Sequence, residues 1–259
     1  MKIALGIEYE GTAFCGWQIQ PRQNTIQGCL EQALHTITGE TATIVAAGRT
    51  DAGVHALQQV VHFETRHHRH ERNWVLGLNS HLPAGINVNW AREVTDDFHA
   101  RFSAKKRHYR YLILNRMSRS ALFQHRMWWL YNELDIERMQ RAADLLIGKH
   151  DFSAFRAREC QARSPVKTLQ SIRIVRQENC IAIDVSARSF LHHMVRNLVG
   201  VLVPIGDGRK PVEWAAHVLE SRQRSQGGVT APPQGLYFVR VDYPDRYALP
   251  VMTGFPVVW

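Results

Sequence analysis

Hydrophobic and polar residues alternate along the chain with two periods, which predict strands and amphipathic helices in a regular order. Runs with period two predict strands, and runs with a period near 3.6 predict helices. The first part reads as strand, helix, strand, strand, helix and strand, at residues 3–9, 24–39, 43–47, 58–64, 71–80 and 86–94. The second part repeats this order with one additional helix. Its elements lie at residues 109–114, 135–146, 169–176, 181–187, 189–201, 212–221 and 236–241.

Capping signals mark the starts of several predicted helices. Asn24 is placed to cap the first helix, with Gln27 at the reciprocal position of a capping box. Ser189 is placed to cap the helix that carries Phe190 and Met194 towards the core. Pro211 suits the first position of the next helix. We therefore expect all three helices to begin next to these residues.

The repeated order of elements predicts two related α+β halves of mixed, mainly antiparallel sheet flanked by helices. We place the N-terminal half at residues 1–104 and the C-terminal half at residues 105–245. An apolar tail, residues 246–259, contains Pro and Gly breakers and receives no predicted element.

Charge adds a class of partner to this picture. The 259 residues contain 32 Lys and Arg against 23 Asp and Glu, which gives a net charge of +9 and a sequence pI near 9.7. This excess is typical of a surface that binds a polyanion, although charge alone does not separate RNA from DNA or a membrane surface. A merely soluble basic protein is the alternative.

The cysteines and the motif inventory limit the chemistry. The four cysteines show neither a CxxC pair nor another zinc spacing, so we expect no metal site and read them as thiols of a reducing, cytoplasmic compartment. No segment has about 18 consecutive apolar residues, so we expect no membrane association. The histidine-rich residues 67–70 read as a loop of a basic protein and not as a metal site. A dinucleotide fingerprint and a P-loop are both missing from the sequence, and we expect no cofactor.

The strongest candidate for chemistry is the stretch AAGRTDAGVHA at residues 46–56. Gly48 and Gly53 flank Arg49, Thr50 and Asp51, and glycines on both sides permit a turn that holds this trio out of a sheet edge. A solvated turn in which Asp51 caps its own backbone is the alternative interpretation.

Two basic stretches are candidates for contacts with nucleic acid. One leads into a strand where period two places Tyr109 and Tyr111 on the same face. Cations can meet phosphates while a ring stacks on an unpaired base, although Tyr109 is equally compatible with a core position. The other is the loop 149–167. The cations of these stretches are Lys105, Lys106, Arg107, Arg156, Arg158 and Arg163.

Arg196 stands among apolar neighbours in its predicted helix. A buried lone charge costs several kcal/mol, so we expect Arg196 to have a carboxylate partner.

Several segments together resemble the TruA-type tRNA pseudouridine synthases. The segments GRTDAGVHA, FCGWQIQP, NTIQGCLEQAL, FHARFSAKKRHYRY, SFLHHMVRNLVG and GLYFVRVDY cover most of residues 2–243 and follow that family's order. The resemblance implies the pseudouridine synthase fold. It also implies that Asp51 is the catalytic residue, that Tyr109 and Leu236 pack on the two sides of the target uracil, and that Arg49 fills the gap left by a flipped nucleotide. An opposing cation would keep a buried Asp51 ionised, and Arg196 is our candidate.

The resemblance further implies a substrate and an assembly. The substrate would be tRNA, modified at uridines 38, 39 and 40 of the anticodon stem-loop by a homodimer. A non-catalytic RNA-binding or chaperone module, an aspartate-based hydrolase and a synthase for a different RNA are the alternatives.

Overall fold

The computed structural model describes residues 1–250, and the chain divides into two compact units. Unit 1 contains residues 1–107 together with the C-terminal segment from Tyr237, and unit 2 contains residues 108–236. The last nine residues of the apolar tail lie outside the described residues.

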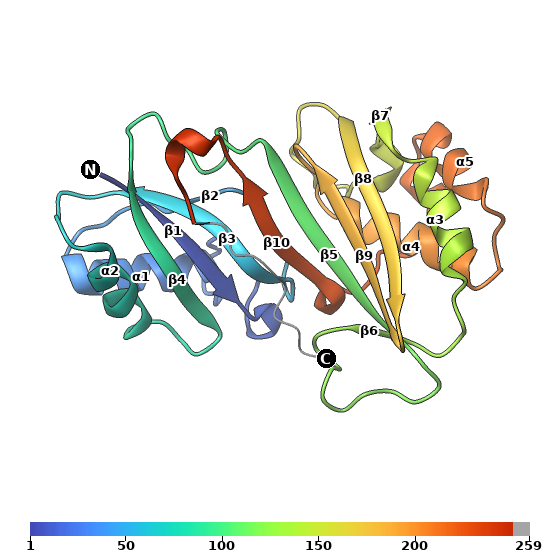
Figure 1. The fold of residues 1–259 in the computed structure, drawn as a ribbon, viewed down its shortest axis with the longest axis horizontal. Coiled ribbons are helices and arrows are strands. Elements are labelled where there is room, and N and C mark those ends of the chain that lie inside the picture. The colour runs from blue at the N-terminus through green and yellow to red at the C-terminus, as the bar shows by residue number, and fades with distance from the viewer. Residues whose placement is uncertain (251–259) are drawn as a thin grey trace. The chain divides into compact units, whose positions relative to one another are not determined.

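Unit 1 is built on a sheet in the order β4-β1-β3-β10, with the short β2 paired to β3 (Figure 1). β1 runs antiparallel to both β3 and β4, whereas β10 pairs parallel with β3. Its elements are β1 (Lys2–Tyr9), α1 (Ile26–Thr38), β2 (Val45–Ala46), β3 (His55–Glu64), α2 (Glu71–Asn79), β4 (Ile86–Val94) and β10 (Leu236–Asp242), with short 3-10 turns at Gly11–Ala13 and Asp245–Tyr247.

Unit 2 contains strands in the order β5-β9-β8-β7, with β6 parallel to β5 (Figure 1). β8 is antiparallel to β7 and to β9, and the helices α3, α4 and α5 gather beside β8 and β7. Its elements are β5 (Lys106–Asn115), β6 (Trp128–Leu130), α3 (Ile136–Asp144), β7 (Gly148–Asp151), β8 (Val166–Gln177), β9 (Cys180–Ala187), α4 (Met194–Gly206) and α5 (Trp214–Ser221), with 3-10 turns at Ser153–Phe155, Arg224–Gln226 and Pro233–Gly235. The predicted α+β class of mixed, mainly antiparallel sheet with helices is confirmed.

The predicted starts of three helices were wrong by one to four residues. Thr25, not Asn24, caps α1, because its extended backbone lets its hydroxyl accept from the Gly28 amide at 3.3 Å. The chain does not become helical at Ser189: α4 follows His193, whose φ of 61° is left-handed. Pro211 lies three residues before the start of α5.

Two short strands were not predicted. β7 occupies the start of the segment that the sequence suggested was a loop, and β6 has only three residues. Both hold their place by pairing with longer strands, β8 and β5, and such pairing leaves no periodic signal in so short a run.

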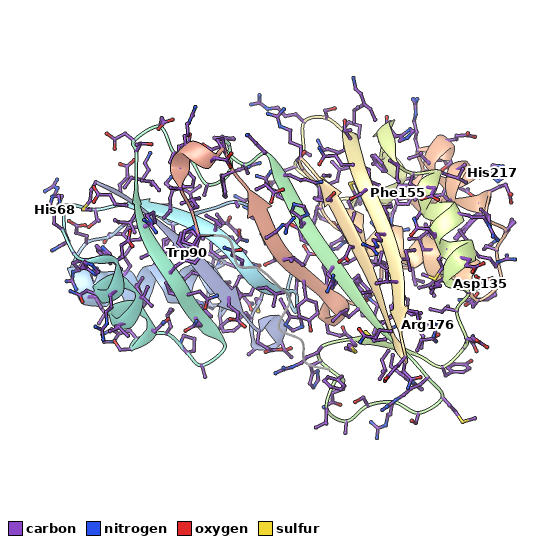
Figure 2. The ribbon with its side chains drawn as sticks, viewed as in Figure 1. His68, Trp90, Asp135, Phe155, Arg176 and His217 are labelled. Carbon is purple, nitrogen blue, oxygen red and sulfur yellow. The ribbon has the colours of Figure 1, made fainter. Side chains whose placement is uncertain are left out.

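The unit 1 core lies on the sheet face that α1 and α2 cover. Ile3 on β1 is opposite Phe63 on β3, and the Phe63 ring meets the Trp74 ring of α2 edge-on at 5.4 Å. Gly6 on β1 leaves room for the ring of Trp90 on β4 (Figure 2). A Cβ on residue 6 would lie 2.1 Å from that ring.

The other face of β3 carries a buried histidine, His62, which pairs across the sheet with Ala4. Its Nδ1 accepts from the Ala100 amide at 3.2 Å, and its ring lies 4.8 Å from that of His99. The pKa of His62 is lowered to about 4, mainly by burial and in smaller part by the charges of His99 and Lys2. His62 is therefore neutral in the folded protein at neutral pH.

Because the pKa of His62 is lowered in the folded state, we expect the protein to lose stability in mild acid. The folded-state pKa lies below the value near 6.5 of an unfolded chain, so only the unfolded state takes up this proton as the pH falls from about 6.5 to about 4. His62→Asn retains an acceptor for Ala100 and removes the titration. We expect its unfolding free energy, measured by urea titration at several pH values, to fall less steeply over this range than that of the wild type. The exposed His68 (Figure 2), changed to Asn, is the control and should leave the slope unaltered. Equal slopes for His62→Asn and wild type would contradict this account.

Candidate active site

Asp51 lies in a loop of unit 1 between β2, which ends at Ala46, and β3, which begins at His55. The Val54 amide donates to the Asp51 carbonyl at 3.2 Å, and Gly53 has a φ of 76°. Within the loop Thr50 is buried, Asp51 is half-buried and Arg49 is exposed. The loop therefore offers a carboxylate and a neighbouring cation at its accessible side.

Two buried polar side chains hold the start of this loop. The amide of Gln59 on β3 accepts from the Gly48 N–H at 3.3 Å and donates to the Gly48 carbonyl at 2.5 Å. The guanidinium of Arg107 donates to the Ala47 carbonyl from Nε at 3.0 Å and from Nη2 at 2.8 Å. Because both partners are buried, these bonds fix where the chain leaves the sheet.

The residue before Asp51 is held on both sides. The Tyr9 hydroxyl and the Thr50 hydroxyl are 2.8 Å apart, and the Trp17 amide donates to the Thr50 carbonyl at 3.0 Å. Burial raises the pKa of Tyr9 to about 12, so its phenol is protonated and uncharged at neutral pH. Gly16, with a φ of 85°, lies so close that an added Cβ would be 2.8 Å from the Thr50 carbonyl oxygen. The Asp51 backbone is thus positioned by β1, β3 and the 16–17 segment.

Sequence reasoning missed these supporting residues. One signal was present for Gln59, a polar residue inside an apolar strand that proves to be fully buried. Tyr9 and Gly16 carried no local signal for this role, because their contacts with Thr50 join segments far apart in the sequence.

Arg107 has a structural role that the sequence did not predict. We predicted that it contacts RNA, but its side chain is buried, and besides Ala47 it donates to the Arg101 carbonyl at 2.7 Å. These bonds join Arg107 to two backbone carbonyls, and its contact with RNA stays a prediction. The other predicted cations remain at the surface: Lys105, Arg158 and Arg163 are exposed, and Lys106 and Arg156 are half-buried.

Unit 2 contains the remaining predicted site residues. Tyr109 on β5 is buried, and its ring meets that of Phe190 edge-on, with centroids 5.0 Å apart. Leu236 is buried at the start of β10. Tyr109 and Leu236 are therefore fixed in position by packing, and their roles at a uracil stay predictions.

Arg196 lies in the first turn of α4 and is half-buried. Its Nε donates to the Ala231 carbonyl at 2.7 Å, and the Tyr111 hydroxyl donates to the next carbonyl, that of Pro232, at 2.7 Å. Burial raises the pKa of Tyr111 well above its usual value, so it acts as a neutral donor. These two bonds fix the segment that leads to Leu236. The predicted ion pair of Arg196 with Asp51 stays a prediction.

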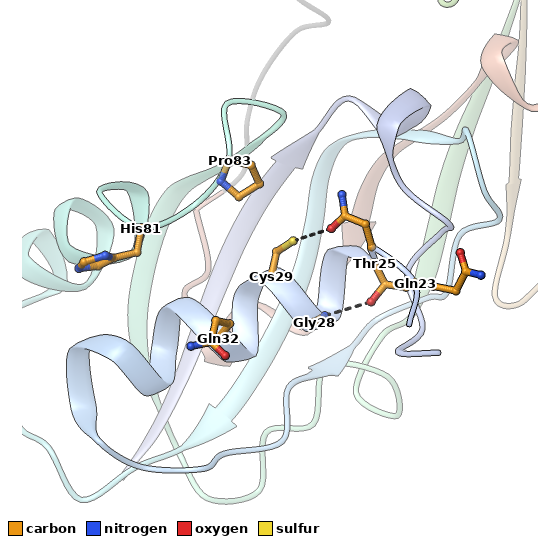
Figure 3. A pocket seen from close by; sticks show the side chains of 8 residues that line it. Gln23, Thr25, Gly28, Cys29, Gln32, His81 and Pro83 are labelled. Carbon is orange, nitrogen blue, oxygen red and sulfur yellow. Dashed lines mark hydrogen bonds between the residues drawn. The ribbon is translucent and has the colours of Figure 1, made fainter. Parts of the chain in front are cut away.

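A separate hollow of about 260 Å³ lies beside α1 in unit 1 (Figure 3). Its lining includes Gln32, His81 and Cys29 but no carboxylate. Burial raises the pKa of the Cys29 thiol, which donates to the Asn24 side-chain oxygen at 3.2 Å. A protonated thiol is a poor nucleophile, so Cys29 is not a candidate nucleophile in this hollow.

Among the helices of residues 1–250, none combines the length and the apolar character needed to cross a membrane.

Comparisons with known proteins find similar sequences over the full length of the chain. The family model described as tRNA pseudouridine synthase matches residues 6–103 and 142–244. A tRNA pseudouridine synthase A of Nitrosococcus oceani is 52% identical over 259 residues, covering 100% of both chains. The protein of that name from Pseudoalteromonas atlantica is 51% identical, covering 99% of this chain and 98% of the relative. That from Thiobacillus denitrificans is 52% identical, covering 96% of each.

Proposed function

This chain belongs to the tRNA pseudouridine synthase family, and we propose that it converts uridines 38, 39 and 40 of the tRNA anticodon stem-loop with Asp51 as the catalytic carboxylate. The protein is a tRNA-modifying isomerase. The observation that supports the role of Asp51 is its position in the loop before β3, which hydrogen bonds to buried side chains hold in place. Asp51 is half-buried in this loop, and Arg49 is exposed.

The reaction needs little beyond a carboxylate and a closely fitting pocket. The bond from ribose carbon 1′ to uracil nitrogen 1 breaks, the detached base turns, and carbon 1′ joins carbon 5. Carbon 5 loses a proton and nitrogen 1 gains one, so the product is an isomer of the substrate. Asp51 can act as a nucleophile at ribose carbon 1′ or at uracil carbon 6, or as a base at carbon 2′.

The other site residues receive roles around this step. Tyr109 stacks on the uracil and takes part in removing the carbon 5 proton, and Leu236 packs against the opposite face. Arg196 supplies the positive charge that keeps Asp51 ionised. Arg49, exposed in the Asp51 loop, occupies the place of the flipped nucleotide and offsets an unstacking cost of a few kcal/mol.

The remaining proposals concern substrate selection, assembly and location. Modifying three neighbouring positions with one pocket requires recognition of backbone shape more than base sequence, and the charge of +9 supports that mode. We further propose a homodimer in which both subunits contact one tRNA, acting in the cytoplasm.

Tritium release tests the reaction. Unmodified tRNA transcripts labelled at carbon 5 of uridine should release tritium when incubated with the enzyme, and the modified sites should map to positions 38 to 40. Release mapped to other positions would replace the substrate assignment, and release of free uracil would indicate a hydrolase. Tight tRNA binding without tritium release would favour a non-catalytic RNA-binding module.

A further inference from the structure

Unit 2 contains a pocket of about 580 Å³ that none of the proposed site residues lines; we call it the α4–α5 pocket. Its walls come from β6, the middle of α4, the start of α5 and the segment 225–229. A pocket of 300–1,000 Å³ is large enough for a small organic ligand, and a single nucleotide falls within this range.

The pocket lies along the same face of α4 as Arg196. Gly200 and Val203 line it, four and seven residues after Arg196, and these spacings place all three on one side of the helix. The chain that covers this face lies in close contact with α4, because a Cβ on Gly200 would be 1.7 Å from the Val229 carbonyl oxygen. Two residues later the Ala231 carbonyl accepts from Arg196. The segment 229–231 therefore runs from the pocket to Arg196.

Two indole side chains give the pocket an aromatic lining. Trp128 on β6 and Trp214 at the start of α5 are both half-buried, so part of each ring stays accessible. The Trp128 ring meets the Tyr111 ring edge-on with centroids 6.3 Å apart, which restricts its orientation. Flat aromatic rings of this kind are stacking surfaces for nucleobases.

Two cations stand at the rim. Both Arg209 and Lys210 are exposed, and the Lys210 ammonium lies 5.1 Å from the centroid of the Trp214 ring. The Arg209 guanidinium is held by Asp207, through a bond of 2.8 Å from Nε, and Asp207 offsets part of the positive charge. The pocket lining itself includes no carboxylate. An anion next to a flat ring is therefore the ligand whose charge and shape fit this pocket.

We propose that the α4–α5 pocket binds one unpaired nucleotide of the tRNA substrate outside the catalytic site. The base stacks on Trp214 and Trp128, and its phosphate meets Lys210 and Arg209. The proposal rests on the proposed function for the identity of the RNA. Its consequence is that the pocket contributes to tRNA affinity and leaves the chemical step unchanged.

Substitutions of the pocket lining separate these effects. Trp214→Leu should raise the Kd for an unmodified tRNA transcript about tenfold, because one stacking contact is lost. Its kcat at saturating tRNA should remain near the wild-type value. Trp129→Leu is the matched control: Trp129 follows Trp128 in the sequence but is not part of the pocket lining, and its substitution should leave the Kd unchanged. Lys210→Gln, a change at an exposed residue, should weaken binding and lower the slope of log Kd against log salt concentration by about one.

Photo-cross-linking locates the nucleotide directly. A transcript containing 4-thiouridine, irradiated with the Asp51→Asn variant to prevent turnover, should attach to peptides that carry Trp128 or Trp214. Unaltered Kd values for Trp214→Leu and Lys210→Gln, or cross-links confined to other peptides, would overturn the proposal. If Trp214→Leu does not fold, the Kd of Lys210→Gln and the position of the cross-link test the proposal. Failure of the wild type to release tritium would instead overturn the proposed function, because neither binding measurement depends on turnover.

Discussion

Asp51→Asn is expected to reduce the rate of tritium release from carbon 5 of uridine by about 10⁴-fold or more, with little change in the Kd for tRNA. The amide has nearly the shape of the carboxylate but cannot act as a nucleophile or a base at neutral pH. The loop should keep its conformation, because its anchors are the Gly48 bonds to Gln59 and the Thr50 bond to Tyr9, neither of which involves the Asp51 side chain. The measurement is single-turnover tritium release at saturating enzyme, alongside tRNA binding.

Two further variants make this test specific. Asp51→Ala excludes activity regained by slow deamidation of the introduced asparagine, and it should be equally inactive. Asp96→Asn removes one negative charge from an exposed position of unit 1 and should retain full activity, which separates the loss of a catalytic group from a change in net charge. Turnover by Asp51→Ala within about tenfold of the wild type would refute the catalytic role, since general acid–base contributions alone exceed that factor. A large rise in Kd with normal single-turnover rates would assign Asp51 to binding.

The elements that sequence patterns predicted well are those whose burial follows a simple period. The strand predicted at 86–94 agrees with β4 at both ends, and the helix predicted at 71–80 agrees with α2 within one residue. The predicted N-cap of α1 was off by one residue because Asn24 and Thr25 are both good capping residues, and the backbone conformation determines which of them caps the helix. At α4 the local signal of Ser189 did not determine where the helix begins.

The candidate site likewise contains one part that the sequence predicted and one part that it did not. Asp51 was predicted as the catalytic residue from the family resemblance of its segment, in which glycines and charges are concentrated in a short stretch of the sequence. The residues that hold this loop could not be predicted in the same way. Arg107 bonds to the Ala47 carbonyl across 60 residues of sequence, and such a contact has no effect on local composition. Arg107 follows Lys105 and Lys106 in the sequence and was therefore predicted to contact RNA. Its burial in the structure shows that it also holds the Asp51 loop. Residues that lie within a short motif are therefore easier to predict than the residues that position that motif.

Gly16→Ala is expected to reduce kcat about 100-fold with little change in the KM for tRNA, although residue 16 takes no part in the chemistry. A Cβ at this position would lie 2.8 Å from the Thr50 carbonyl oxygen and 3.0 Å from the Asp51 carbonyl carbon. Backbone atoms cannot turn aside as a flexible side chain can, so the Asp51 loop must move. A displacement of about 1 Å is enough to cost a factor of this size when it misplaces a reacting group.

The matched control for Gly16→Ala is Gly39→Ala, which separates displacement of the loop from backbone strain. Gly39 ends α1 with a φ of 73°, close to the 85° of Gly16, but a Cβ there would have nothing within 4 Å. Both variants should lose about 1–2 kcal/mol of stability from the left-handed backbone, visible as a lower thermal midpoint. Only Gly16→Ala should lose kcat. Wild-type kcat in Gly16→Ala would show that the loop tolerates the collision, whereas equal losses in both variants would attribute the effect to stability and not to the position of Asp51.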